Sequence, residues 1–315
     1  LFSFNEPIAV RLVNIAEENY MILLRVLTFL AVALHTLLLV TLAQRSSSVP
    51  AGLSKVGMLT RAYVDDQRKN WEGTEPRPLR TSIWYPASPT ASQSETIFGG
   101  PPDKEVFAPM TVAPGADISP AFQKYPLVVM SHGTGGSSIQ MMWLGYYLAS
   151  RGYIVAAVNH HGNTAAERQP APQGFRLYWE RAKDLSVVLD KLLADPVFGP
   201  RVNRERIGAA GFSLGGYTVI SVAGGRFSLQ EFESFCSSPQ RDFTCEPQPE
   251  FPDAPRLFEE LKKSDPVVQE SLRRASDSFR DKRIKRVFVI APALGSGFTK
   301  PGLSDIKVPV FIIAG

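Results

Sequence analysis

Short apolar runs recur along the chain from residue 125 onward, and each one ends at small or polar residues. Runs of this length without apolar–polar alternation are typical of strands that are buried on both faces of a sheet. We therefore predict three buried strands, in YPLVVMSHG (125–133), YIVAAVNH (153–160) and RIGAAG (206–211). RVFVIAP (286–292) and VPVFIIAG (308–315) are two further strand candidates. An earlier segment, RPLRTSIWYP (77–86), alternates instead and predicts a strand that ends at a proline.

Helical spacing of apolar residues appears between these runs. Ile139–Ser150 has such spacing, and Arg176–Ala194 places its apolar side chains on one face. Leu214–Ala223 predicts a third helix, which is rich in small residues. Strands that alternate with helices predict an α/β fold with a mainly parallel sheet and helices on both of its faces.

Two segments depart from this alternation. Pro86–Pro126 is rich in Pro, Gly, Ser and Thr, and it predicts mostly loop. Gly224–Lys285 is too long for an ordinary connection between a helix and a strand. It contains a charged segment, Ala254–Arg280, which predicts a helix. We expect residues 224–285 to be a cap inserted into the α/β domain.

The N-terminal part has the pattern of an export signal. MILLRVLTFLAVALHTLLLVTLAQ (21–44) combines Arg25 with an apolar core and ends in small residues before Gln44. We expect a signal peptide over residues 21–43 and regard residues 1–20 as upstream translation. The alternative is an uncleaved membrane anchor, although the apolar run is shorter than the roughly 18–20 residues of a membrane span.

The overall composition is that of a soluble globular protein. Of the 315 residues, 44% are apolar and 20% are charged, and the mean hydropathy is −0.05. The net charge is +4, but the basic residues around 273–286 alternate with acidic and apolar ones. This pattern is typical of a solvated helix face, so we expect no nucleic-acid partner.

The segment GFSLGG (211–216) places Ser213 between glycines, directly after a predicted strand and before a predicted helix. This G-x-S-x-G form is typical of a nucleophile presented at a tight strand-to-helix turn. Glycines two positions before and after the serine relieve the backbone crowding of such a turn. The helix N-terminus and the N–H of Leu214 would favour a negative oxyanion. The weaker alternative is an ordinary glycine-rich turn.

The two cysteines of the chain, Cys236 and Cys245, lie in CSSPQRDFTC. In an exported protein, such a pair predicts a disulfide that closes a small loop. The alternative is two buried free thiols. The chain has four histidines and none is near this pair, so four ligands for a metal ion cannot be assembled here.

Three motifs occur in the order SHGTGG (131–136), NHHGNT (159–164) and GFSLGG (211–216). In this order and spacing they resemble the α/β-hydrolase superfamily. The resemblance is to bacterial proteins identified as dienelactone hydrolases, which are similar to platelet-activating-factor acetylhydrolases. VGMLTRAYVDDQR, IWYPA, the cysteine-containing insert and APALGSGFT extend the resemblance over residues 55–315.

The resemblance implies a serine ester hydrolase whose triad is completed by an aspartate and a histidine. It implies Ser213 as the nucleophile and the backbone N–H groups of Thr134 and Leu214 as oxyanion donors. We expect His132 to hold the loop before Thr134 and not to act as the base. Dienelactone hydrolases use a cysteine where Ser213 stands, and IAPALG (290–295), where the acetylhydrolases carry their acid, has no carboxylate.

The order of the triad in this superfamily is serine, acid, histidine. In this sequence no histidine follows His161. We therefore expect residues 44–315 to be an incomplete hydrolase domain, with the catalytic acid and histidine beyond Gly315. The fragment alone is expected to be inactive.

The favoured function is an exported serine carboxylesterase, secreted or periplasmic, that forms an acyl-enzyme on Ser213. Its expected substrate is a small-molecule or lipid ester, with no cofactor, no metal and no stable membrane span after signal cleavage. One alternative is a lipase or polyester hydrolase, in which residues 224–285 would shape a groove for long substrates. An alternative of another class is a catalytically inactive α/β-hydrolase that serves as a binding module.

Overall fold

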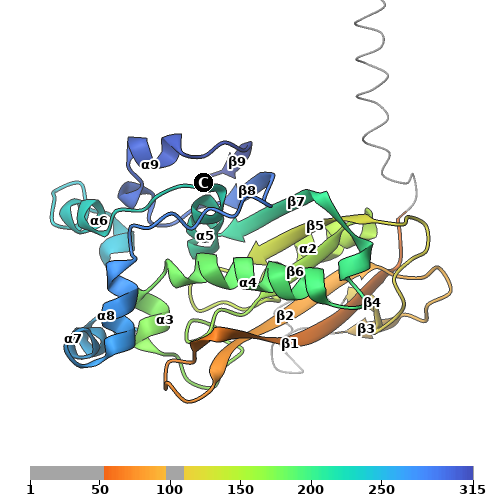
Figure 1. The fold of residues 1–315 in the computed structure, drawn as a ribbon, viewed down its shortest axis with the longest axis horizontal. Coiled ribbons are helices and arrows are strands. Elements are labelled where there is room, and N and C mark those ends of the chain that lie inside the picture. The colour runs from red at the N-terminus through yellow and green to blue at the C-terminus, as the bar shows by residue number, and fades with distance from the viewer. Residues whose placement is uncertain (1–52, 97–109, 315) are drawn as a thin grey trace, which may run out of the picture. The chain divides into compact units, whose positions relative to one another are not determined.

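The computed structural model describes residues 53–96 and 110–314 (Figure 1). The expected signal peptide at 21–43 and the upstream residues 1–20 lie outside the described residues. Within the described part of the chain, no helix is both long enough and apolar enough to cross a membrane.

The described strands form one sheet in the order β3-β4-β1-β2-β6-β5-β7-β8-β9. From β6 to β9 in this order, neighbouring strands are parallel, whereas β2 pairs antiparallel with both β1 and β6. The mainly parallel sheet predicted from the sequence is confirmed. The bounds are β1 (Val56–Lys69), β2 (Pro76–Pro86), β3 (Ser94–Thr96), β4 (Met110–Pro114), β5 (Tyr125–Ser131), β6 (Ile154–Val158), β7 (Val202–Phe212), β8 (Arg286–Ile290) and β9 (Val310–Ile313).

Helices pack on both faces of this sheet, as predicted. Side chains of α4 and α5 form one core cluster with Leu127 and Val129 of β5. Side chains of α2 form a second cluster with Met130 of β5 on the opposite face, because successive residues of a strand point to opposite sides. The bounds are α2 (Met142–Ser150), α3 (Pro172–Arg176), α4 (Glu180–Ala194), α5 (Leu214–Ala223), α6 (Leu229–Cys236), α7 (Ala254–Ser264), α8 (Pro266–Arg273) and α9 (Lys300–Ser304).

The central strands carry apolar residues at nearly every position because both faces of the sheet are covered. All five residues of β6 are buried. The parallel strands β5, β6 and β7 end at the same edge of the sheet. The motifs at 131–136, 159–164 and 211–216 each lie at or next to one of these ends, so the fold brings the three motifs together.

Some elements differ from the prediction. The sequence pattern does not predict β1, which spans 14 residues, because charged residues that are buried as ion pairs interrupt its apolar positions. The segment Pro86–Pro126 contains β3 and β4 in addition to loop. The helix expected from Arg176 begins at Glu180, since Pro172–Arg176 forms the separate helix α3.

The segment Gly224–Lys285 contains α6, α7 and α8, and Figure 1 shows α7 and α8 beside α3. The single helix expected over Ala254–Arg280 is wrong. Pro266 lacks the N–H that a continuous helix would need, and it begins α8 as its first residue. Asp265 caps this second helix by accepting hydrogen bonds from two backbone N–H groups of α8.

Candidate active site

The turn between β7 and α5 holds Ser213 in a strained backbone conformation. Its φ is 54° and its ψ is −117°, a region that residues with a side chain rarely occupy. The N–H of Ser213 donates to the carbonyl of Ile290 at 2.9 Å, and its carbonyl accepts from the N–H of Ala293 at 3.1 Å. Residues at and just after the end of β8 therefore hold this turn in place. The side chain at its centre is half-buried.

Two glycines make the turn possible because neither position has room for a side chain. A Cβ on Gly211 would lie 2.0 Å from the carbonyl oxygen of Gly215. A Cβ on Gly215 would lie 1.9 Å from the carbonyl oxygen of Ser131. The glycines two positions before and after Ser213 therefore let the end of β5 and the first turn of α5 approach each other.

Ser213 lines a cavity of about 160 Å³. Its walls come from the loop after β5, from α3, from the segment after α5 and from the loop after β8. Among the described residues, no group of three or more His, Cys, Asp or Glu side chains could hold a metal ion. The wall combines aromatic, aliphatic and polar side chains with one residue of each charge, and it includes Thr134, Leu214, Phe175, Tyr178, Phe232, Phe243, Arg176 and Glu233.

The loop after β5 lies against Ser213. A Cβ on Gly133 would lie 3.3 Å from the Cβ of Ser213. The N–H groups of Gly133 and Gly135 donate to a glutamine and an asparagine side chain, at 2.8 Å and 2.7 Å. The N–H of Thr134, between them, has no acceptor among the described residues, nor has that of Leu214, the first residue of α5. These two donors therefore remain free for a ligand in the cavity.

His132, in the same loop, is buried and uses both ring nitrogens within the protein. Its Nδ1 donates to the carbonyl of Gly133 at 2.7 Å, and its Nε2 accepts from the N–H of His160 at 3.2 Å. Burial and the charge of Arg181 hold the pKa of His132 well below its ordinary value. The neutral ring is thus arranged to support the loop and has no nitrogen left to accept a proton from Ser213.

His160 joins Ser131 and Asp184 in a hydrogen-bonded chain with the connectivity of a catalytic triad. Its Nε2 lies 2.9 Å from Ser131 Oγ, and its Nδ1 lies 2.9 Å from Asp184 Oδ2. However, Ser131 is 0% exposed and His160 is 1% exposed. Because no substrate can reach Ser131, this chain of side chains supports the fold under the turn and is not a catalytic triad.

The carboxylate of Asp184 is the centre of a buried charge cluster. Nε and Nη2 of Arg77 donate to its two oxygens at 2.9 Å and 3.1 Å, and Nη2 of Arg68 donates at 2.6 Å. Burial alone would raise the pKa of Asp184, but these guanidinium groups outweigh it and hold the pKa well below its ordinary value. Burial and the charge of Arg181 lower the pKa of His160 to about 3, so His160 is uncharged at neutral pH.

Both ring nitrogens of His161 also make contacts within the protein. Its Nδ1 lies 2.9 Å from Glu167 Oε1, and its Nε2 accepts from the backbone N–H of Trp71 at 3.2 Å. The indole of Trp71 stacks on the imidazole ring. Across residues 53–96 and 110–314, then, no histidine has a ring nitrogen available to Ser213.

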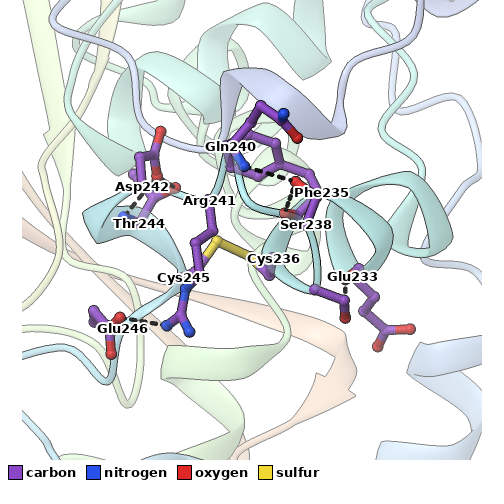
Figure 2. The surroundings of a disulfide bond; sticks show 11 residues. Glu233, Phe235, Cys236, Ser238, Gln240, Arg241, Asp242, Thr244, Cys245 and Glu246 are labelled. Atoms are coloured by element: carbon purple, nitrogen blue, oxygen red, sulfur yellow. Dashed lines mark hydrogen bonds and ion pairs between the residues drawn. A yellow bond between two sulfur atoms is a disulfide. The ribbon is translucent and has the colours of Figure 1, made fainter.

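The predicted disulfide between Cys236 and Cys245 is present (Figure 2). It joins the end of α6 to a short 3₁₀ helix, and Figure 2 shows the ion pair between Arg241 and Glu246 beside it. Both cysteines lie in the wall of the cavity that contains Ser213. The disulfide therefore ties together two segments of this wall.

Sequence reasoning missed the buried charges of α4. Arg181 and Asp184 are 1% and 0% exposed. A signal for them exists, because each lies four positions before a buried apolar residue of the same helix, Leu185 and Val188. Residues at this spacing share one side of a helix, which places both charges next to the apolar stripe.

Comparisons with known proteins agree with the motifs. The family model described as platelet-activating factor acetylhydrolase, isoform II, matches residues 107–171, a range that includes the loop after β5 but not Ser213. The platelet-activating factor acetylhydrolase of Cavia porcellus is 28% identical to this chain in the matched segment, which covers 31% of this chain and 31% of that protein. The match thus spans about a third of the length of this relative.

The fold is also similar to a solved esterase. The structure of a ferulic acid esterase from Streptomyces cinnamoneus superposes with a TM-score of 0.54 and 25% sequence identity. The superposition covers 85% of this chain and 67% of that chain. Together with the sheet order, these similarities confirm the α/β-hydrolase fold and fit a family of serine esterases.

Proposed function

We propose that this chain, an α/β-hydrolase that fits the serine esterases, hydrolyses carboxylic esters through an acyl-enzyme on Ser213. One observation carries the proposal. A serine with a strained backbone shares a cavity wall with the unused N–H groups of Thr134 and Leu214. Two unused donors beside a nucleophile are what acyl transfer requires, since the carbonyl oxygen becomes negative in the transition state.

In the proposed reaction, Ser213 Oγ attacks the carbonyl carbon of the ester while a histidine accepts its proton. The N–H groups of Thr134 and Leu214 stabilise the oxyanion, and the positive end of α5 adds to this stabilisation. The histidine then returns the proton to the leaving alcohol. Water attacks the acyl-enzyme with the help of the same base, which releases the carboxylic acid and restores Ser213.

We propose that the catalytic acid and histidine lie beyond Gly315. In support, His132, His160 and His161 each use both ring nitrogens for other contacts. Without a base, the hydroxyl of Ser213 is a poor nucleophile, so residues 44–315 alone should retain only residual catalysis. Equal turnover of a short-chain ester by residues 44–315 and by the full-length gene product would contradict this proposal.

The cap proposed for residues 224–285 supplies part of the cavity wall. Phe232 and Glu233 of α6 and both cysteines belong to that wall. The small volume of the cavity, about 160 Å³, favours a short acyl group over a long chain. The proposal is therefore a carboxylesterase, with a lipase or polyester hydrolase as the alternative for long substrates.

The activity can be tested with p-nitrophenyl esters of increasing acyl length and the purified full-length gene product. Turnover that is highest with acetate or butyrate would support the carboxylesterase, and turnover that increases up to palmitate would support the lipase. A folded protein that turns over none of them and does not react with a fluorophosphonate would be a binding module, and the proposed function would be wrong.

We also propose that the protein is exported and that residues 21–43 are removed. The disulfide supports export, because such bonds persist mainly in oxidising compartments. Protein secreted by a suitable host should begin at or near Gln44 when its N-terminus is sequenced. Protein that stays in the cytoplasm with Met21 intact would contradict the proposal.

A further inference from the structure

Arg181 contacts the loop that carries Thr134 directly and is linked to the backbone of Leu214 through the side chain of Thr218. Its Nη2 donates to the carbonyl of His132 and lies 3.3 Å from Ser131 Oγ. Its Nε donates to Thr218 Oγ1 at 3.2 Å. The hydroxyl of Thr218 in turn donates to the carbonyl of Leu214 at 2.9 Å.

Arg181 differs from the neighbouring buried arginines in its partners. Arg77 and Arg68 pair directly with Asp184, whereas no carboxylate of the described residues lies within ion-pair distance of Arg181. Its Nη1 has no hydrogen-bond partner in the described part of the chain. Burial lowers the pKa of Arg181 to about 9.

Keeping a guanidinium in this place is therefore costly for the folded state. An apolar side chain of similar volume usually stabilises a buried site at least as well as an incompletely paired charge. Stability alone thus gives little reason for an arginine at this position. Its contacts give another reason, because each one leads to a segment that carries an oxyanion donor.

We propose, on the premise of the esterase reaction above, that Arg181 is a positioning residue that sets the spacing between the two oxyanion donors. The carbonyl of His132 belongs to the loop that carries the N–H of Thr134. The carbonyl of Leu214 belongs to the residue that supplies the second N–H. One rigid guanidinium joins the two segments, directly on one side and through the hydroxyl of Thr218 on the other.

This role predicts a specific kinetic defect. Oxyanion donors act only within about 2.7–3.1 Å of the developing charge. A changed spacing therefore weakens transition-state stabilisation while substrate binding in the ground state is preserved. The kcat should fall and KM should change little.

Arg181→Lys tests the proposal, because an ammonium keeps the charge but cannot span both acceptors as a planar guanidinium does. In the full-length enzyme, kcat should fall by roughly 10- to 100-fold. The affinity for a trifluoromethyl ketone, which adds to the serine and forms an oxyanion, should fall by a similar factor. Thr218→Val keeps the side-chain volume but removes one of the two links, and it should lose about tenfold or less in both quantities.

Arg77→Lys is the matched control, since it makes the same change in the same buried cluster but away from the oxyanion segments. It should lower Tm, with kcat and ketone affinity unchanged at temperatures below thermal unfolding.

If Arg181→Lys and Thr218→Val also change only Tm, Arg181 is structural and the inference is overturned. If Arg181→Lys does not fold, Thr218→Val decides alone. A wild-type enzyme that neither turns over esters nor binds the ketone overturns the proposed function, and the inference with it.

Discussion

Ser131 and Ser213 lie at the ends of the neighbouring strands β5 and β7, and they differ in every property that governs reactivity. Ser131 is connected to His160 and, through it, to Asp184, yet it is 0% exposed. Ser213 has no histidine partner among the described residues, but it lines a cavity with two unused N–H donors. The connectivity of a triad therefore does not identify a nucleophile, and access and free donors are the reasons for proposing Ser213.

The electrostatic surroundings of the two serines lead to the same conclusion. The imidazole beside Ser131 has a pKa of about 3, so it is a poor proton acceptor at neutral pH. The carboxylate beside this imidazole, that of Asp184, is paired with Arg77 and Arg68. The cavity at Ser213, in contrast, is lined by two residues, Thr134 and Leu214, whose N–H groups have no acceptor among the described residues.

The largest effect should come from replacing the two serines in turn. Ser213→Ala should lower the kcat of the full-length enzyme by roughly 10⁴- to 10⁶-fold, because the covalent route is removed. Ser131→Ala is the matched control and should keep both turnover and labelling by a fluorophosphonate, as detected by intact mass. Labelling that survives in Ser213→Ala and disappears in Ser131→Ala would reverse the assignment.

The next effect concerns the charges beneath Ser131. Asp184→Ala leaves Arg77, Arg68 and His160 without their common partner, and it should destabilise the fold by about 3–5 kcal/mol. Asp66→Ala removes only an exposed partner of Lys191 and should cost about 1 kcal/mol or less. Urea denaturation measures both values. Equal losses in the two variants would show that the buried cluster contributes no more than a surface ion pair.

A smaller loss of stability is expected when the disulfide in the wall of the Ser213 cavity is removed. The bond closes a loop with a sequence separation of 9, and replacing both cysteines by serine should cost at most about 2–3 kcal/mol. Since both cysteines lie in the cavity wall, KM should rise more than kcat falls. Thermal denaturation and steady-state kinetics test these points, and an unchanged KM would separate the bond from the substrate site. Alkylation of the unreduced, denatured wild type should label neither cysteine.

The smallest effect is the pH dependence of stability. His160 binds its proton more weakly in the folded state, with a pKa of about 3, than in the unfolded chain, where the pKa is about 6.5. Its contribution is therefore present above about pH 6.5 and is lost as the pH falls toward the folded value. Between about pH 7.5 and about pH 5.5 this one group should cost about 1.4 kcal/mol.

His132, whose pKa is also lowered, changes stability in the same direction. Urea unfolding of wild type and of His160→Gln at the two pH values isolates the share of His160. The variant should lose part of the pH dependence and keep the part that comes from His132. Identical pH dependence in the two proteins would contradict the prediction.

How much the sequence could predict depends on whether the signal is local. The turn at Ser213 and the helix over Leu214–Ala223 follow from residues that are adjacent in the chain, and the helix has the expected bounds. The strand β1 cannot be predicted from adjacent residues in this way. Its residue Asp65 is only 3% exposed, although a hydrophobicity pattern treats an aspartate as solvent-facing. Its partner Arg68 also pairs with Asp184 in α4, a contact that no local pattern contains.

The same limit applies to the histidines of the candidate site. The sequence alone does not show which contacts His132, His160 and His161 make, since each stands at a strand end near a glycine. Their partners decide their roles, and Asp184, for example, lies 24 residues from His160. Only the packed structure determines which ring nitrogens are occupied.

The contact between Gly215 and the carbonyl of Ser131 has a consequence for how the molecule can evolve. Any side chain at Gly215 would push α5 away from β5 and separate Ser213 from the loop that carries Thr134. Substitutions of Gly215 should therefore not be tolerated at this turn. The wall formed by α6 and the following loop includes largely exposed residues such as Phe243, and it can be exchanged without disturbing the turn. Substitutions in that wall can thus change the shape of the cavity while the turn at Ser213 stays as it is.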